Sequence, residues 1–265
     1  MMNRIDQKFI ELRKAKKKAF IAFITAGDPD LHTTEELVLA LEKAGADIVE
    51  LGVPFSDPLA DGPTIQAASY RSLQKGTTLR KILATVKRIR ARSDVPIALM
   101  TYYNPVFHFG EKAFVQQAKA AGVDGVIIPD LPLEEAGDLR RFAMKSGLAT
   151  IFFVAPTTTP ERLKPVVKAA TGFIYYVSVA GVTGARKAVP SEIAVKIRLV
   201  KALTRKPVCV GFGVSTPEQA RAISRVADGV IVGSAIVKKI KEFEGSKDLV
   251  PRVRAFVAAL VKAIK

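Results

Sequence analysis

The sequence has few of the residues that metal sites and disulfides need. Its 265 residues include one cysteine, Cys209, and two histidines, His32 and His108, and tryptophan is absent. A single cysteine excludes an internal disulfide and a Cys-x-x-Cys zinc site, and it is typical of a reducing compartment. We therefore expect a cytoplasmic protein without a metal site. His32 lies where a helix should start and His108 in a loop, and we expect structural roles for both.

Long apolar runs are also absent. None approaches the roughly 18 residues that a membrane-spanning helix needs, so we expect no association with a membrane. The segment RKAKKKAFIAFITAG imitates the basic and apolar regions of a signal peptide. However, acidic residues interrupt its basic region, and Ile5, Phe9 and Leu12 recur at helical spacing. These features favour a short amphipathic helix that leads into a strand.

Acidic residues are fewer than basic ones. The chain has 25 Asp and Glu against 41 Lys and Arg, a formal net charge of +16, which raises nucleic acid as a partner. In segments such as LRKILATVKRIRAR the basic residues alternate with apolar ones at helical period, and there is no arginine-rich tail. This pattern favours solvated helical faces over a specific nucleic-acid site.

Apolar runs rich in β-branched and aromatic residues recur along the whole chain. There are eight, at residues 19–27, 47–53, 96–103, 125–132, 149–156, 173–180, 207–214 and 229–236. Helical patterns separate them, as in HTTEELVLALEKAGA and TPEQARAISRVA, and most end with a glycine before the next strand. Near-continuous apolar strands that alternate with helices predict a parallel sheet covered on both faces.

The number of units favours a closed barrel. Eight units in roughly 250 residues fit a (β/α)8 TIM barrel better than an open doubly wound sheet, which usually has about five or six strands. We expect residues 1–265 to form one barrel domain with an extra N-terminal helix. The last segment should pack on the barrel exterior through one helical stripe, formed by Val253, Phe256, Val257, Leu260 and Ile264.

The strand ends carry an unusual set of ionisable residues. In such barrels the catalytic groups lie at the carboxyl ends of the strands and in the following loops. None of the eight runs contains lysine or histidine, which argues against a Schiff-base lysine and a metal site built from strand histidines. What remains is Glu50, Asp57, Asp61, Asp130 and the tyrosines at 102, 103, 175 and 176. A site made of these groups would work by proton transfer.

Two of these acids lie in different surroundings. Glu50 lies in an apolar run, where burial would raise its pKa toward neutrality and let it exchange a proton near pH 7. The alternative is a structural carboxylate satisfied by backbone amides or a tyrosine hydroxyl. Asp61, in a loop rich in glycine and proline, should stay ionised and hold positive charge or accept a hydrogen bond. Asp57 fits a turn or an interface, and Asp130 fits a loop anchor.

The second half of the chain has a pattern typical of an anion site. Glycine with small or hydroxylated neighbours follows the last three strands, in AGVTGAR, GFGVSTPEQA and GSAIVKKI. Gly233 and Ser234 should open a short helix, whose N-terminal amides and dipole favour an anion. Barrels commonly bind phosphate at the loops after the seventh and eighth strands. The alternative is that these glycines serve only tight turns.

The sequence resembles the tryptophan synthase alpha subunit family over nearly its whole length. The resemblance rests on FITAGDPD, VELGVPFSDPLADGPTIQAA, YYNP, PDLPLEE, AGVTGAR and GFGVSTPEQ, which occur in the family's order and spacing. It implies a lyase of tryptophan biosynthesis that cleaves indole-3-glycerol phosphate into indole and glyceraldehyde 3-phosphate. It also implies a retro-aldol route without a metal or cofactor in this chain.

The resemblance assigns roles to individual residues. It implies that Glu50 is the general acid and base for the indole C3 carbon and the glycerol hydroxyl, that Asp61 accepts the indole N–H, and that Tyr175 is a third active-site residue. The residues that match phosphate-binding amides are Gly184, Gly213, Gly233 and Ser234. Those that match the indole pocket and the closing loop are Phe23, Met100, Ile127, Phe212 and Thr183.

The resemblance also implies a partner. A beta subunit that uses pyridoxal phosphate would receive the indole in an αββα heterotetramer, and Pro54 and Asp57 are candidate contacts. Two alternatives remain open. One is another phosphate-binding barrel enzyme of the same pathway, which would need a catalytic lysine or a further acid at other strand ends. The other is a basic nucleic-acid-binding protein.

Overall fold

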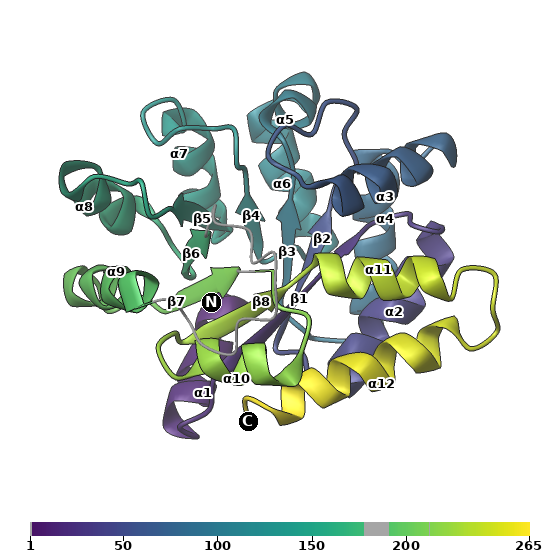
Figure 1. Ribbon diagram of the computed structural model, residues 1–265. Helices are drawn as coiled ribbons and strands as arrows, with labels where there is room; N and C mark the ends of the chain where they lie inside the picture. The colour runs from purple at the N-terminus through teal and green to yellow at the C-terminus, as the bar shows by residue number, and fades with distance from the viewer. Residues whose placement is uncertain (1, 178–190, 212) are drawn as a thin grey trace.

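The computed structural model describes residues 2–177, 191–211 and 213–265. Within them, eight parallel strands form a closed barrel in sequence order, with each strand paired to the next and β8 paired to β1. The strands are β1 Ala19–Thr25, β2 Ile48–Gly52, β3 Ile97–Met100, β4 Gly125–Ile127, β5 Ala149–Val154, β6 Ile174–Val177, β7 Val208–Gly211 and β8 Gly229–Val232. The expected TIM barrel is confirmed (Figure 1).

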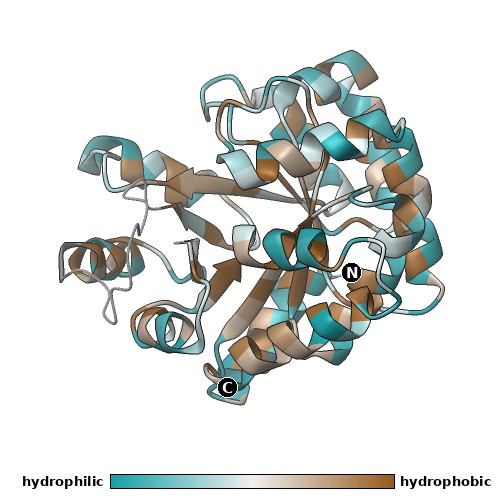
Figure 2. Cartoon of the chain, turned by 45° about the vertical axis from the view of Figure 1, so that its right-hand side comes forward, coloured by the Kyte–Doolittle hydropathy of each residue, from teal (hydrophilic) through white to brown (hydrophobic). Residues whose placement is uncertain are grey.

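Helices surround the barrel (Figure 1). They are α1 Arg4–Lys14, α2 Leu31–Lys43, α3 Pro63–Gln74, α4 Leu79–Arg90, α5 Tyr103–Phe109, α6 Glu111–Ala121, α7 Gly137–Ser146, α8 Pro160–Ala169, α9 Ser191–Leu203, α10 Pro217–Ser224, α11 Ser234–Glu242 and α12 Leu249–Lys262. Figure 2 shows the hydrophobic strands enclosed by helices whose outer faces are hydrophilic. This arrangement explains why the strands read as near-continuous apolar runs, since both faces of the sheet are covered.

Side chains on the strands alternate between two cores. On β1, Phe20, Ala22 and Ile24 pack with the surrounding helices, whereas Ile21 belongs to a second cluster inside the barrel. That inner cluster also contains Ile48, Ala98, Ile127, Ile151, Tyr175, Cys209 and Ile231. Period-two alternation therefore turns Phe23 on β1 and Glu50 on β2 toward the barrel interior.

The extra N-terminal helix is confirmed, and it covers one end of the inner core. Ile5, Phe9 and Leu12 of α1 are buried and belong to the inner cluster, and the Phe9 ring lies 5.9 Å from the Phe173 ring. The side chain of Asn3 accepts a hydrogen bond from the Ile5 amide and donates one to the Asp124 carbonyl. These contacts fix α1 at the barrel end where the strands begin.

The C-terminal stripe behaves as expected. Val253, Val257, Leu260 and Ile264 are buried, and Phe256 is partly buried against the same core. Helix α12 packs against α2 and α11, so its apolar stripe covers other helices on the barrel exterior (Figure 1).

Several boundaries differ from the sequence-based expectation. The third run was expected to remain a strand to residue 103, but β3 ends at Met100 and α5 begins at Tyr103, so His108 lies in a helix instead of a loop. The last run divides into β8 and the start of α11. Aromatic residues are frequent in α5, so its sequence resembles the end of a strand.

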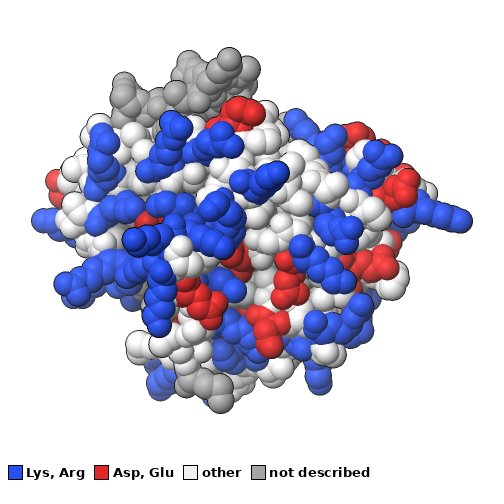
Figure 3. All heavy atoms as spheres, turned by 90° about the horizontal axis from the view of Figure 1, so that it is seen from below, with Lys and Arg blue, Asp and Glu red and all other residues white. Residues whose placement is uncertain are grey.

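The excess positive charge lies largely on the helices. On α4, Ile82, Leu83, Val86 and Ile89 are buried while the basic residues between them face outward, which confirms the solvated face. Figure 3 shows Lys and Arg gathered over much of the lower surface. Among the described residues no helix combines the length and apolarity that a membrane crossing requires.

Candidate active site

Glu50, in the middle of β2, is the candidate acid that lies deepest in the barrel. Its side chain is fully buried, and neither carboxylate oxygen has a hydrogen-bond partner among the described residues. Burial raises the pKa of Glu50 to about 8, because low-dielectric surroundings disfavour the charged form. A purely structural carboxylate would have amide or hydroxyl partners. Glu50 instead holds its proton at pH 7.

The neighbours of Glu50 explain this protonation. Its register partners on β1 and β3 are Phe23 and Ala98, both apolar. Gly52 lies one pleat beyond Glu50, and a Cβ there would lie 2.6 Å from Cζ of Phe23. Only the missing side chain of Gly52 lets the Phe23 ring lie across the end of β2. The ring thereby shields Glu50 from water.

Asp61 lies in the loop between β2 and α3. Gly62 caps α3 and Pro63 is its first residue, so the helix start fixes the position of Asp61. The side chain is half-buried. Burial raises the pKa of Asp61 to about 6, and a hydrogen bond from the Tyr102 side chain acts in the opposite direction. At pH 7 Asp61 is therefore mostly ionised, as expected, although it is less hydrated than its loop position suggests.

Tyr175 points into the barrel from β6. It is buried, and its ring lies 4.7 Å from the Phe153 ring. Burial raises its pKa well above the usual value, and the charges of Glu50 and Asp61 raise it further. Gly211 on β7 leaves room for it, since a Cβ there would lie 3.0 Å from the Tyr175 hydroxyl oxygen. Tyr175 thus presents a neutral hydroxyl within the field of both carboxyl groups.

A narrow cleft lies beside Asp61, at the proposed indole pocket. Phe23, Met100 and Asp61 line it together with Ser69 and Tyr102. Ile127 is the register partner of Met100 and lies in the inner core. The structure thus brings Phe23 and Met100 directly to Asp61, with Ile127 next to Met100. Phe212 lies outside the described residues.

The candidate phosphate residues surround the ends of β7 and β8. Gly213 is exposed with φ +65°, a left-handed conformation, and among the described residues no atom beyond its chain neighbours lies within 4 Å of where its Cβ would be. Gly233 caps α11 and Ser234 begins it, and no described side chain caps the helix, so amides at its start can bind an anion. A Cβ on Gly233 would lie 3.2 Å from Phe23. Gly184 and Thr183 lie outside the described residues.

Asp130, Asp57 and His32 have structural contacts. A carboxylate oxygen of Asp130 accepts a hydrogen bond from the Tyr103 amide at 2.9 Å, which confirms the loop anchor. Asp57 is exposed in the loop, where it accepts a hydrogen bond from Ser56. His32 lies in the first turn of α2, 3.7 Å from Glu36. In the described part of the chain, no three or more His, Cys, Asp and Glu residues group as metal ligands.

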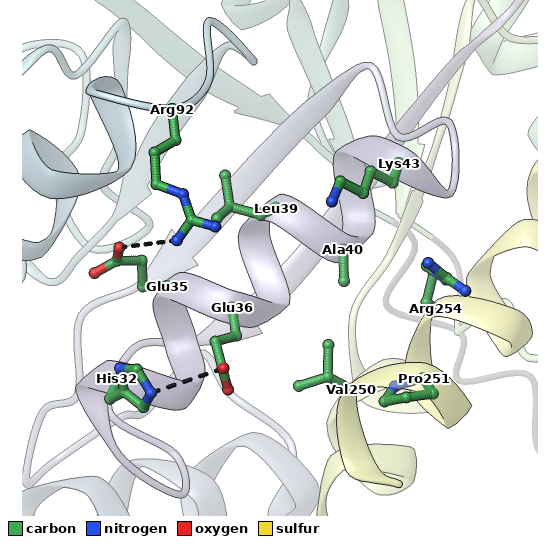
Figure 4. A pocket seen from close by; sticks show the side chains of 10 residues that line it. All are labelled: His32, Glu35, Glu36, Leu39, Ala40, Lys43, Arg92, Val250, Pro251 and Arg254. Carbon is green, nitrogen blue, oxygen red and sulfur yellow. Dashed lines mark ion pairs between the residues drawn. The ribbon is translucent and has the colours of Figure 1, made fainter.

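A wider groove lies away from this site, between α2 and α12 (Figure 4). Two ion pairs lie along it, His32 with Glu36 and Glu35 with Arg92, each at 3.7 Å. Lys43 and Arg254 lie on its other side. It contains no strand residue and opens on the outer surface, so we do not assign the reaction to it.

Comparison with known proteins identifies the family. The sequence profile described as tryptophan synthase alpha chain matches residues 9–265. The alpha chain of Geotalea daltonii is 55% identical over 263 residues, which cover 99% of each chain. The chain belongs to the tryptophan synthase alpha chain family. The alpha chain of Caldanaerobacter subterraneus is also similar, at 50% identity over 259 residues and 98% of each chain.

Solved structures support the same assignment. Tryptophan synthase subunit alpha from Legionella pneumophila has a TM-score of 0.93 and 40% identity, covering 100% of this chain and 99% of its own. A structure of tryptophan synthase from M. tuberculosis in its aminoacrylate-bound form has a TM-score of 0.89 and 36% identity, covering 99% and 100%. As a member of the tryptophan synthase alpha family, the protein is a lyase that cleaves indole-3-glycerol phosphate in tryptophan biosynthesis. The alpha chain needs no cofactor, because pyridoxal phosphate belongs to the beta chain.

Two features of this alpha-chain site had no role assigned from the sequence. Tyr102 was noted only as an ionisable residue in the third run, yet its hydroxyl bonds the Ala60 amide and its side chain lines one cleft with Asp61. Gly52 read as part of an apolar strand, although it accommodates the Phe23 ring. The glycine directly before VPFSDP is the only sequence signal for the second feature, and nothing in the sequence links residues 60 and 102.

Proposed function

We propose that Glu50 and Asp61 divide the retro-aldol cleavage of indole-3-glycerol phosphate between a protonated and an ionised carboxyl group. The observation that supports this most strongly is the buried, unpartnered Glu50, whose pKa of about 8 lies above that of Asp61, about 6. At pH 7 one group can donate a proton while the other accepts positive charge. Two acids with separated pKa values are suited to two roles.

The proton of Glu50 starts the reaction. Transfer to C3 of the indole ring makes the ring an electron acceptor and puts positive charge at N1, whose N–H is hydrogen-bonded by the Asp61 carboxylate. The Glu50 carboxylate then removes the proton from the glycerol hydroxyl next to the ring. The carbon–carbon bond breaks, and its electron pair returns to the ring. Indole and glyceraldehyde 3-phosphate leave, and Glu50 is again protonated.

Other residues of the site position the substrate. Tyr175 supplies a neutral hydroxyl beside the carboxyl groups, and Phe23, Met100 and Ile127 form an apolar surface for the ring. The amides at Gly213, Gly233 and Ser234 would bind the phosphate, with the N-terminus of α11 adding a favourable dipole. Binding energy from this remote group would orient the reacting bond. Gly184, Phe212 and Thr183 stay assigned by resemblance alone.

We further propose that the chain works with a beta subunit in an αββα assembly. The loop between β2 and α3 supports this, because Leu59 is 95% exposed at its tip and Phe107 on α5 is 68% exposed. Large apolar residues at a catalytic mouth fit a surface that a partner covers. Asp57 remains a candidate contact, whereas Pro54 is buried and is a poor one. A single 1–265 domain and a cytoplasmic location remain interpretations from sequence.

The direct test is indole release from indole-3-glycerol phosphate by the purified chain, alone and with a saturating beta subunit. We expect slow release alone and at least about tenfold activation by the partner, because docking at the mouth would favour a closed loop. If the isolated chain is already fully active, and a beta subunit that is shown to bind does not change this activity, then the proposed activation by loop closure is wrong. The assigned cleavage reaction would still stand. A chain that releases no indole in either condition would contradict the assigned roles.

A further inference from the structure

Tyr102 makes an unusual pair of contacts next to the catalytic acids. It precedes α5 as its N-cap and is 5% exposed, and its ring stacks on Phe55 with centroids 5.2 Å apart and planes at 28°. Its hydroxyl oxygen accepts a hydrogen bond from the Ala60 amide at 2.9 Å. Asp61 lines the same cleft as Tyr102. Burial raises the pKa of Asp61, and hydrogen bonding by the Tyr102 side chain lowers it. One phenol therefore bonds the backbone of Ala60 and lies beside the carboxyl group of the next loop residue.

The Tyr102 hydroxyl can donate one hydrogen bond while it accepts another. A phenol has one proton to donate, and its oxygen can accept at the same time. Because the Ala60 amide occupies the accepting side, the proton is directed to Asp61. A donor of this kind stabilises the carboxylate over the carboxylic acid. Burial raises the pKa of Asp61, and this donor offsets part of that increase.

The other groups near Asp61 cannot replace this donor. Glu50 on β2 is protonated at pH 7 but has no hydrogen-bond partner among the described residues. Tyr175 on β6 interacts with Asp61 through charge alone. Burial raises the pKa of the Tyr102 phenol, and the charges of Asp61 and of Asp130, after β4, raise it further, so the phenol stays protonated. Tyr102 is thus the neutral donor that the structure directs at Asp61.

We propose that Tyr102 is the positioning residue for Asp61: its hydroxyl fixes the β2–α3 loop at Ala60 and holds the neighbouring carboxylate oriented and ionised. This inference rests on the proposed role of Asp61 in the cleavage reaction. Tyr102 acts on the reaction through Asp61, and the ring stacked on Phe55 keeps the hydroxyl in place. Loop position and carboxylate charge are then linked, because a single hydroxyl contacts both.

The test compares Tyr102→Phe with Tyr103→Phe. The first change removes the hydroxyl and keeps the ring on Phe55. The second is a matched control, because the Tyr103 hydroxyl donates to Glu111 and does not contact Asp61. The readout is the pKa of Asp61, measured by NMR titration of carboxyl-labelled aspartate and assigned with Asp61→Asn. Tyr102→Phe should raise this pKa by about one unit, equivalent to about tenfold in the ionisation constant, and Tyr103→Phe should leave it unchanged.

Hydrogen exchange tests the backbone contact separately. The Ala60 amide should exchange at least about tenfold faster in Tyr102→Phe, since a lost bond of about 1.4 kcal/mol corresponds to that factor. An unchanged Asp61 pKa together with unchanged exchange at Ala60 would overturn the proposal. If both shifts appear while Asp61→Asn retains full activity, Tyr102 still positions Asp61 and only the catalytic role of Asp61 fails.

Discussion

Phe23 on β1 and Glu50 on β2 are register partners, and both side chains point into the barrel. The Phe23 ring lies across Gly52, directly beyond Glu50, and a Cβ added to Gly233, at the start of α11, would lie 3.2 Å from it. One aromatic ring therefore lies beside the proposed proton donor, the proposed indole pocket and the proposed phosphate site. Burial causes the high pKa of Glu50, and its apolar register partners Phe23 and Ala98 contribute to that burial.

Replacing Phe23 should therefore change the acidity of Glu50. Phe23→Ala would admit water and lower the Glu50 pKa, so the basic limb of the kcat/KM profile should move down by about one pH unit. Phe23→Leu keeps the surroundings apolar and should move the limb much less. The measurement is kcat/KM for indole-3-glycerol phosphate between pH 5 and about 9.5. An identical basic limb in both variants would show that Phe23 does not set the acidity of Glu50.

Replacing each of the two acids by its amide should reduce the activity by different amounts. Glu50→Gln cannot exchange a proton, so turnover should fall by at least about 10³ while the fold is retained. Asp61→Asn should cost less, on the order of 1.5 to 3 kcal/mol of transition-state stabilisation, if Asp61 only balances charge. Steady-state kinetics of both variants gives the comparison. Equal and mild losses would reject the division of labour.

Burial of Glu50 should also appear in the stability of the fold. The folded-state pKa of about 8 lies above the ordinary value of 4.5. Folded Glu50 thus binds its proton more tightly, so its contribution to stability is full below about pH 4.5 and declines as pH rises to about 8. Glu50→Gln lacks this dependence, so its free energy of unfolding relative to wild type should rise with pH, by up to about 1.4 kcal/mol per pH unit.

Urea unfolding at several pH values between 5 and about 8 measures this difference. The comparison uses how the difference in free energy of unfolding between Glu50→Gln and wild type changes with pH. The cost of burying an amide in place of an acid is the same at each pH, so it does not affect this change. A constant difference across this range would mean that Glu50 is not desolvated as the structure indicates.

The proposed phosphate site can be tested by charge alone. Gly213 has a left-handed φ, which asparagine and aspartate both tolerate better than most residues. Gly213→Asp should raise KM for indole-3-glycerol phosphate at least about tenfold more than Gly213→Asn, because a like charge would face the phosphate. Glycerol phosphate should also compete with substrate in the wild type. Equal KM values in the two variants would place the phosphate elsewhere.

The sequence predicted the barrel because both faces of each strand are covered, which leaves apolar runs at a regular interval. The burial of Glu50 was predictable for a related reason, since it lies inside such a run. Helix α5 was missed because its aromatic residues resemble the end of a strand. The role of Tyr102 was not predictable, because it depends on a contact between residues 60 and 102 that only the closed barrel creates.

The most direct test of the central claim is the pH dependence of kcat/KM for cleavage of indole-3-glycerol phosphate. Protonated Glu50 and ionised Asp61 predict a bell with limbs near the pKa values of about 6 and about 8. The substrate phosphate also titrates near pH 6, so Asp61→Asn must be measured in parallel. Loss of the acid limb in that variant, with a basic limb near 8 retained, would support the assignment. A rate that keeps rising above pH 8 would contradict it.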